Sequence, residues 1–329
     1  MSKTGTSSPK KQRKDHFVPQ VYLRRFIDKS TGKLHVYDRQ TNTWFDAAPR
    51  SICFEFGWDN LNHDGTDTYL YDNLKTLESR LTAFLREFEA GPISDKDRYY
   101  FSTWLAILFS LSPKKTNYDT AFLQNLVRNA NIQINVDKYD TKQMNMEKVK
   151  EIALALYTSD WHIIYNYTST PFITCDFPAH HYCLNDYFDP EYQPFGIALD
   201  PKHFLKITPK IPIVIDRTKD YTEHLPGILT RGYVKYGRYF LKTISRINEH
   251  AIFNAERFII APYFDNGLTQ FVKNRKNKTT KLYATVKKTP NGPIIKTRLK
   301  NNFDNVPVII TKQLIKKLTQ SEDLPSPKH

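Results

Sequence analysis

A short stretch near the N-terminus carries side chains that suit acid–base and anion chemistry. Proline is well tolerated at the first position of a helix, so we expect a short helix from Pro19 to Ile27. Gln20 and Arg24 are four residues apart and share one face of it, while His16 precedes the first turn, where backbone N–H groups favour anions. Together these side chains could hold a phosphate or transfer a proton. The alternative is a capped helix whose arginine packs on a carboxylate.

A second group of polar residues could bind a metal ion. It consists of Cys175, Asp176, His180, His181 and Cys183, and cysteine and histidine suit zinc. The spacing matches no zinc finger or knuckle, however, and adjacent side chains on a regular strand point to opposite faces. A buried Cys175 at the end of a strand explains the pattern better, so no metal ligand is assigned. A divalent metal cofactor is compatible with the sequence, but no motif indicates one.

Motifs of several large enzyme classes are missing from the sequence. Gly227 and Gly232 have the spacing of a P-loop, but Tyr233 and Val234 stand where lysine and serine or threonine would hold phosphate and magnesium. There is no G-x-G-x-x-G, G-x-S-x-G or H-E-x-x-H. The sequence therefore gives no support to an ATPase, a dinucleotide-binding enzyme, an α/β-hydrolase or a zincin.

The chain is basic, with 48 Lys and Arg residues against 34 Asp and Glu and a net charge of +14. The excess lies in two segments without acidic residues, and the rest is close to neutral. They contain Lys3, Lys10, Lys11, Arg13 and Lys14, then Lys273, Arg275, Lys276, Lys278, Lys281, Lys287, Lys288, Lys296, Arg298 and Lys300. Basic patches attract polyanions, so we predict nucleic-acid binding by the second segment, from Lys273 to Arg298. The alternative is a solvated tail and a solubilising lobe.

Composition also indicates the compartment and the domain organisation. Three cysteines, a polar N-terminus and no apolar run of membrane-spanning length predict a cytoplasmic protein that contacts no membrane, with signal-less secretion as an alternative. We expect a disordered basic arm over 1–14, a main α+β domain over 15–265, a basic C-terminal subdomain over 266–320 and a loose tail over 321–329.

The hydrophobic pattern predicts a helical middle packed on a mostly antiparallel sheet. Apolar residues at three- and four-residue steps predict helices over 70–88, 97–111, 120–130, 147–157 and 239–258, and a short one near 312–318. Strands are expected over 34–38 and 43–46 as a hairpin, over 51–58, over 161–167 paired with 171–175, over 204–208 paired with 211–215, and in a hairpin around 291–293. Strands and helices do not alternate as in a parallel doubly wound sheet, so the fold class is α+β.

Two motifs resemble a known family. They are His16-Phe-Val-Pro-Gln-x-Tyr-Leu-Arg-x-Phe26 and, after a strand that begins with tryptophan, Pro171-Phe-Ile-Thr-x-Asp176-x-Pro178. With Asn248 and a late Arg257-Phe-Ile, they resemble the uncharacterised bacterial family of domains of unknown function numbered 4238, over about residues 15–265. Cys175 and Phe177 depart from the family pattern, where a small polar residue and asparagine are expected.

The resemblance implies no activity, but it groups distant residues. It implies that one site gathers His16, Gln20, Arg24, Asp176, Asn248 and Arg257. Polar residues from distant parts of a chain commonly assemble catalytic or binding sites. They could equally form a buried polar network that fixes the fold.

Three functions are compatible with these residues. The first is a nucleic-acid-processing enzyme, an RNase or DNase in a toxin or defence role, with RNA or DNA as its partner. His16 would then be the general acid or base, Asp176 would orient it or hold a metal, and Arg24 and Arg257 would steady phosphate charge. The second is a non-enzymatic nucleic-acid-binding or adaptor protein. The third is an enzyme that acts on a small anionic substrate.

Overall fold

The computed structural model describes residues 14–61, 69–89, 91–129, 133, 135–181, 187–188, 194–209, 219–234, 238–277, 279–289 and 292–303. Its helices are α1 (Gln20–Leu23), α2 (Tyr69–Glu87), α3 (Asp95–Leu111), α4 (Pro113–Asn129), α5 (Lys138–Glu147), α6 (Val149–Thr158), α7 (Arg238–Asn254) and α8 (Asn266–Lys273), with the 3-10 turns η1 (Arg24–Phe26), η2 (Pro49–Ser51) and η3 (Tyr221–Glu223). No described helix is both long enough and apolar enough to cross a membrane.

The described strands form four sheets. They are β1 (Lys14–His16), β2 (Leu34–Asp38), β3 (Thr43–Ala47), β4 (Phe54–Phe56), β5 (Asp160–Asn166), β6 (Thr174–Cys175), β7 (His180–His181), β8 (Tyr187–Phe188), β9 (Phe195–Asp200), β10 (His203–Thr208), β11 (Leu229–Val234), β12 (Phe258–Ala261), β13 (Thr279–Thr289) and β14 (Gly292–Phe303). Their orders are β1-β4, β11-β5-β10-β9-β7, β3-β2-β12-β6 and β13-β14-β8. Among these strands only β11 and β5 pair in parallel, so the expected α+β class with a mostly antiparallel sheet is confirmed.

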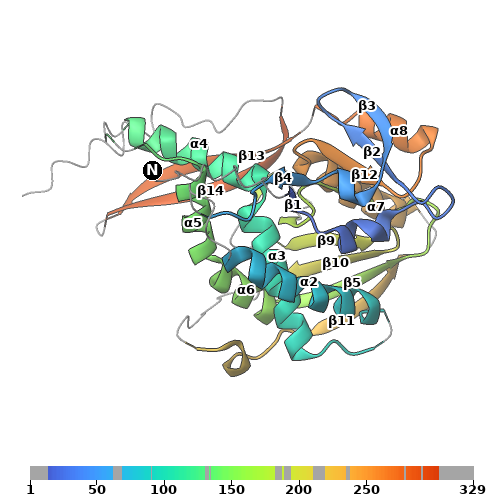
Figure 1. Cartoon of the computed structure of the whole chain (residues 1–329), viewed down its shortest axis with the longest axis horizontal. Helices are drawn as coiled ribbons and strands as arrows, with labels where there is room; N and C mark the ends of the chain where they lie inside the picture. Colours follow the sequence, from blue (N-terminus) through green and yellow to red (C-terminus); the bar gives the residue numbers. More distant parts are fainter. Residues whose placement is uncertain are drawn as a thin grey trace, which may run out of the picture.

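Helices α2, α3 and α6 lie together beside the five-stranded sheet (Figure 1). The contact is aromatic: the ring of Trp161 on β5 meets the edges of Phe84 on α2 and Phe101 on α3, with centroids 6.2 and 5.7 Å apart. Phe84 and Phe101 also stack on each other at 3.9 Å. All three side chains are buried, which explains why α3 is apolar on most faces.

Helix α7 packs on the four-stranded sheet. Ala251 and Ile252 of α7 share a buried cluster with Ile259 and Ala261 of β12 and with Cys175 of β6. Figure 1 shows α8 beside β2 and β3 at the same end of the molecule. This second core holds the C-terminal end of α7 against the start of β12.

Most of the expected elements are present. The predicted hairpin is present as β2–β3, with Asn42 in its turn at a φ of 59°. Helices α2, α3 and α7 match their predicted ranges within a few residues, whereas α4 starts seven residues earlier than the expected 120, at Pro113. The predicted helix from Pro19 to Ile27 is wrong in its geometry, because α1 ends at Leu23 and a tighter 3-10 turn follows.

The predicted strand pairing is wrong in one place. Strand β5 pairs with β10 and β11, whereas β6 pairs with β12, so 161–167 and 171–175 belong to different sheets. The main chain of Asn166 instead donates to Lys202, and Phe172 to Pro201. The range expected over 51–58 is strand only at β4. The segments expected over 211–215 and 312–318 lie outside the described residues.

The region expected as the basic C-terminal subdomain begins with α8 and continues with the β13–β14 hairpin, which confirms the hairpin expected around 291–293. It contacts the rest of the chain: Arg275 donates to Glu249 at 2.8 Å, and Arg39 donates to the Lys276 carbonyl at 2.7 Å. Strand β14 also pairs with β8. The division of the chain at residue 265 stays a prediction.

Candidate active site

A cavity of about 540 Å³ opens beside the N-terminal motif. It is lined by Lys14, Asp15, His16, Gln20, Val21, Arg24, Trp58, Asp59, Leu74, Lys75, Glu78, Ser79 and Thr82. These residues come from β1, α1, η1, the segment after β4 and one face of α2. Ligand pockets commonly span about 300–1,000 Å³, so this cavity has room for a group the size of a nucleotide.

The local fold points the polar side chains of the motif outward. Tyr22 and Leu23 are fully buried, and the Tyr22 hydroxyl donates to the carbonyl of Ala198 at 2.7 Å and lies 2.7 Å from the hydroxyl of Thr174. This anchor leaves the opposite face of α1 to the cavity. The Arg24 guanidinium there reaches the side-chain oxygen of Gln20 at 3.5 Å. The predicted sharing of one face by these two residues is present in the structure.

Burial of His16 favours the neutral form of its imidazole. His16 ends β1, where it pairs with Phe54 of β4, and its ring lies 5.9 Å from the Phe54 ring. Burial lowers the pKa of His16, although a hydrogen bond to the backbone of Arg50 acts in the opposite direction. The buried Nε2 has no hydrogen-bond partner among the described residues, so that bond belongs to Nδ1. Nδ1 then carries the proton and Nε2 keeps a lone pair, as a general base requires.

Charged groups of both signs line the cavity together with His16. Asp15 and Asp59 are buried in the cavity wall. Glu78 approaches from α2, and partial desolvation of its carboxyl group raises its pKa. Lys75 lines the cavity from the same helix. The site can therefore offer a base and an acid together with cations for an anionic group.

A buried lysine outside the cavity lining bonds the main chain of a lining residue. Lys142 of α5 is 3% exposed and donates from Nζ to the Trp58 carbonyl at 2.7 Å. Burial lowers the pKa of Lys142 to about 8, against the attraction of nearby carboxylates that include Glu55 and Asp59. Lys142 thus fixes the loop that carries Trp58 and Asp59.

Asp176, Asn248 and Arg257 lie outside this cavity. The Asp176 carboxylate accepts the main-chain N–H groups of residues 256, 257 and 258 at 2.8, 2.7 and 3.0 Å. Arg257 donates from Nε and Nη2 to one oxygen of Asp38 at 2.9 and 2.8 Å. The Asn248 side chain accepts from the N–H of Ile173 at 3.1 Å and donates to the Pro171 carbonyl at 2.8 Å.

The residues grouped by the sequence therefore fall into two sets. His16, Gln20 and Arg24 line one cavity, whereas the contacts of Asp176 and Asn248 are made with main-chain groups that join β6, α7 and β12. A catalytic role for Asp176, Asn248 and Arg257 stays a prediction.

Comparison with known proteins gives one family. The model of the family described as "Protein of unknown function (DUF4238)" matches residues 14–262. The chain belongs to this family. No curated protein and no solved structure matches it. The DUF4238 match contains β1 to β12, and hence both sets of residues, and ends before α8 and the β13–β14 hairpin.

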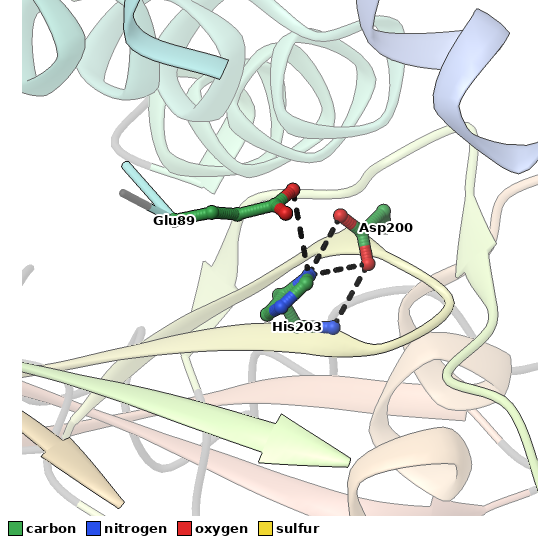
Figure 2. A group of neighbouring side chains, drawn as sticks. All are labelled: Glu89, Asp200 and His203. Carbon is green, nitrogen blue, oxygen red and sulfur yellow. Dashed lines mark hydrogen bonds and ion pairs between the residues drawn. The ribbon is translucent and has the colours of Figure 1, made fainter. Parts of the chain in front are cut away.

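One side-chain group in the described part of this DUF4238 chain has the composition of a metal site. Glu89, Asp200 and His203 place ligand atoms within 4.8 Å of one another (Figure 2). Nδ1 of His203 lies 2.8 Å from both Asp200 oxygens. Arg25 donates to Glu89 at 2.7 Å and also bonds Asp200, so a guanidinium already neutralises both carboxylates. The group is an ion-pair network that ties η1 to the end of α2 and to the β9–β10 turn.

The cysteine–histidine group of the sequence is only partly described. Cys175 is buried and donates from Sγ to the Phe177 carbonyl at 3.1 Å, and burial raises the pKa of its thiol. His180 is buried, and burial lowers its pKa to about 3. Cys175 is therefore a buried residue at the end of β6, as the sequence analysis preferred over a metal ligand. Cys183 lies outside the described residues.

The predicted nucleic-acid-binding residues lie beyond the DUF4238 match. Lys273 ends α8 and is exposed, while Arg275 and Lys276 follow it and bond Glu249 and Asn42. Lys281, Lys287 and Lys288 lie on β13, and Lys296 and Arg298 on β14. Lys278 lies outside the described residues.

Sequence reasoning missed the part of the cavity that α2 provides. Lys75, Glu78, Ser79 and Thr82 recur at the spacing i, i+3, i+4 and i+7, so they form one polar stripe opposite the apolar face of the helix. That stripe was visible in the sequence. Its position across from α1 was not, because a long-range contact between the two helices sets it.

Proposed function

We propose that the cavity is an active site for phosphoester chemistry and that the protein is a nucleic-acid-processing enzyme of the RNase or DNase kind. The observation that carries this proposal is that His16, whose pKa is lowered by burial, and Arg24 line the same cavity. General base catalysis needs a neutral imidazole, and phosphoryl transfer needs fixed positive charge beside the phosphate.

In the proposed reaction, Nε2 of His16 takes the proton from an attacking water or ribose hydroxyl. The freed oxygen bonds to phosphorus, and the bond from phosphorus to the leaving oxygen breaks. Glu78 supplies a proton to the leaving oxygen, since its raised pKa keeps a larger share of it protonated. Arg24 and Lys75 steady the charge on the remaining phosphate oxygens.

The positive charge of the chain supports a polyanionic substrate. Between Asp265 and Asp304 every charged residue is basic. A segment of this kind raises the local concentration of nucleic acid and steers it to the protein. A role in toxicity or defence is compatible with such an enzyme and rests on no further observation.

A second candidate is an enzyme for a small anionic substrate. The cavity of about 540 Å³ favours it, because that volume encloses one nucleotide-sized molecule. In that case the basic segment has no part in catalysis. A non-enzymatic binding protein is the remaining alternative, and cleavage assays separate it from the first two.

The test is incubation with single- and double-stranded RNA and DNA and with mononucleotides, with and without divalent metal. His16→Ala is compared with His162→Ala, because burial also lowers the pKa of His162 but that ring bonds Thr230 on the sheet, away from the cavity. Loss of cleavage in the His16→Ala variant, with cleavage retained in the His162→Ala variant, would support the proposal. Binding without cleavage would support the adaptor, and turnover of mononucleotides alone would support the second candidate.

A further inference from the structure

The β13–β14 hairpin sorts its residues onto two faces. Its register runs from Thr279 opposite Phe303 to Thr289 opposite Gly292, with an irregularity only at the first pair. Residues directly opposite each other share a face, and successive residues of a strand alternate between faces. One face, which we call the basic face, carries positions Lys281, Lys287, Lys296, Arg298 and Lys300. The other carries Leu282, Val286, Ile295 and Leu299, with Lys288 as its basic residue.

The sequence places no acidic residue on either strand of the hairpin. In the register, position Lys281 is directly opposite position Lys300, so two basic positions share this face. From Lys281 to Lys287 the face extends about 20 Å, at about 3.3 Å per residue. That length matches about six base pairs of duplex, which carry a phosphate on each strand every 3.4 Å. A row of phosphates would supply the missing negative charge.

The hairpin is fixed to the molecule at its base. Leu299 and Lys300 of β14 pair with β8, and β13 contacts α7. Figure 1 shows the two strands, in orange and red, extending from there away from the sheets of the main body. The hairpin therefore projects as a two-stranded ribbon, with its basic positions distributed from base to tip.

We propose that the basic face of this ribbon binds double-stranded DNA along the major groove. The inference rests on the proposed nucleic-acid function and adds the class of nucleic acid. The major groove of B-form DNA admits a two-stranded ribbon, whereas that of A-form RNA is too deep and narrow. Single-stranded nucleic acid is held by stacking on several aromatic rings, whereas the basic face of the hairpin has one aromatic position, Tyr283, with Tyr187 of β8 beside it at the base.

Fluorescence anisotropy of a labelled DNA duplex, its single strand and the matching RNA duplex tests this. Contact of five cations with phosphates predicts that duplex DNA affinity falls about 500-fold between about 50 and 200 mM salt. The triple variant Lys281→Gln, Lys296→Gln and Arg298→Gln leaves two cations, so its affinity should fall only about 12-fold over the same range. An equally charged control replaces the exposed Lys29, Lys33 and Lys96 by glutamine and should keep the steep dependence.

Lys287 and Lys288 give the sharpest comparison. They are adjacent and carry the same charge, but they occupy opposite faces of the ribbon. Lys287→Gln should reduce the salt dependence of duplex binding by about one ion, whereas Lys288→Gln should leave it unchanged. Equal effects of the two variants, tighter binding of single strands or RNA, or absence of duplex binding would overturn the assignment. Binding is read without turnover, so a protein that binds duplex DNA but cleaves nothing would refute the proposed enzyme and leave this inference standing.

Discussion

Replacing Asp176 by alanine should destabilise the fold rather than alter chemistry in the cavity. The carboxylate is 5% exposed and accepts three main-chain N–H groups at the start of β12, at 2.7 to 3.0 Å. Hydrogen bonds to a charged group contribute about 1.5–3 kcal/mol each, but desolvation of the carboxylate offsets part of that sum. Since three buried donors lose their acceptor, we expect the free energy of unfolding to fall by about 3–5 kcal/mol.

Urea denaturation followed by tryptophan fluorescence measures this loss. Asp46→Ala is the control, because Asp46 is an exposed carboxylate that pairs with His35 and should cost less than about 1 kcal/mol. Asp176→Asn keeps one acceptor oxygen, so its loss of unfolding free energy should lie between those of Asp176→Ala and Asp46→Ala. If Asp176→Ala unfolds within about 1 kcal/mol of the wild type but loses activity, Asp176 acts in catalysis and the structural interpretation is refuted.

Three further changes test other parts of the structure. Gly227→Ala should destabilise by about 3 kcal/mol, measured by urea denaturation, because the new Cβ would lie 1.9 Å from the Ser159 carbonyl oxygen. Burial lowers the pKa of Lys142 to about 8, so between about pH 8 and 10.4 the unfolded chain binds a proton that the folded chain has lost. The free energy of unfolding should therefore increase as the pH is raised through this range, and it should increase less in Lys142→Met. Arg25→Gln should lower the free energy of unfolding by about 2 kcal/mol, because two carboxylates lose their cation. The variant should also bind Co²⁺ at Glu89, Asp200 and His203, detected by the absorption spectrum of the ion, while the wild type should bind none.

Local patterns predicted α2, α3, α6 and α7 but missed α5 and α8, and they predicted one strand pairing wrongly. The apolar repeat from Leu70 to Phe88 gives α2 because a helix needs only the spacing of nearby residues. The pairing of β5 with β10 and β11 depends on contacts with residues far along the chain, which local spacing cannot select. The strand β9 lies within an apolar stretch that alternation alone does not distinguish from a buried loop.

The candidate site was predictable only where its residues are close in sequence. His16, Gln20 and Arg24 lie within nine consecutive residues at or next to α1, so their spacing alone predicted that they could act together, and they line the same cavity. Asp176 and Arg257 come near each other in the structure because β6 pairs with β12. The sequence could suggest that they meet, but their hydrogen bonds to main-chain groups and Asp38 depend on the exact turn before β12.

The pH dependence of cleavage by wild type and His16→Ala tests the central claim most directly. Burial lowers the pKa of His16, so its neutral form persists below the ordinary value of about 6.5. We predict that single-turnover cleavage rises from neutral pH toward lower pH as Glu78 gains its proton, then falls as the His16 ring gains one, and that His16→Ala loses about 100-fold or more at pH 7. A His16→Ala protein that cleaves at the wild-type rate, with the same pH profile, would contradict the assignment of this cavity as the active site.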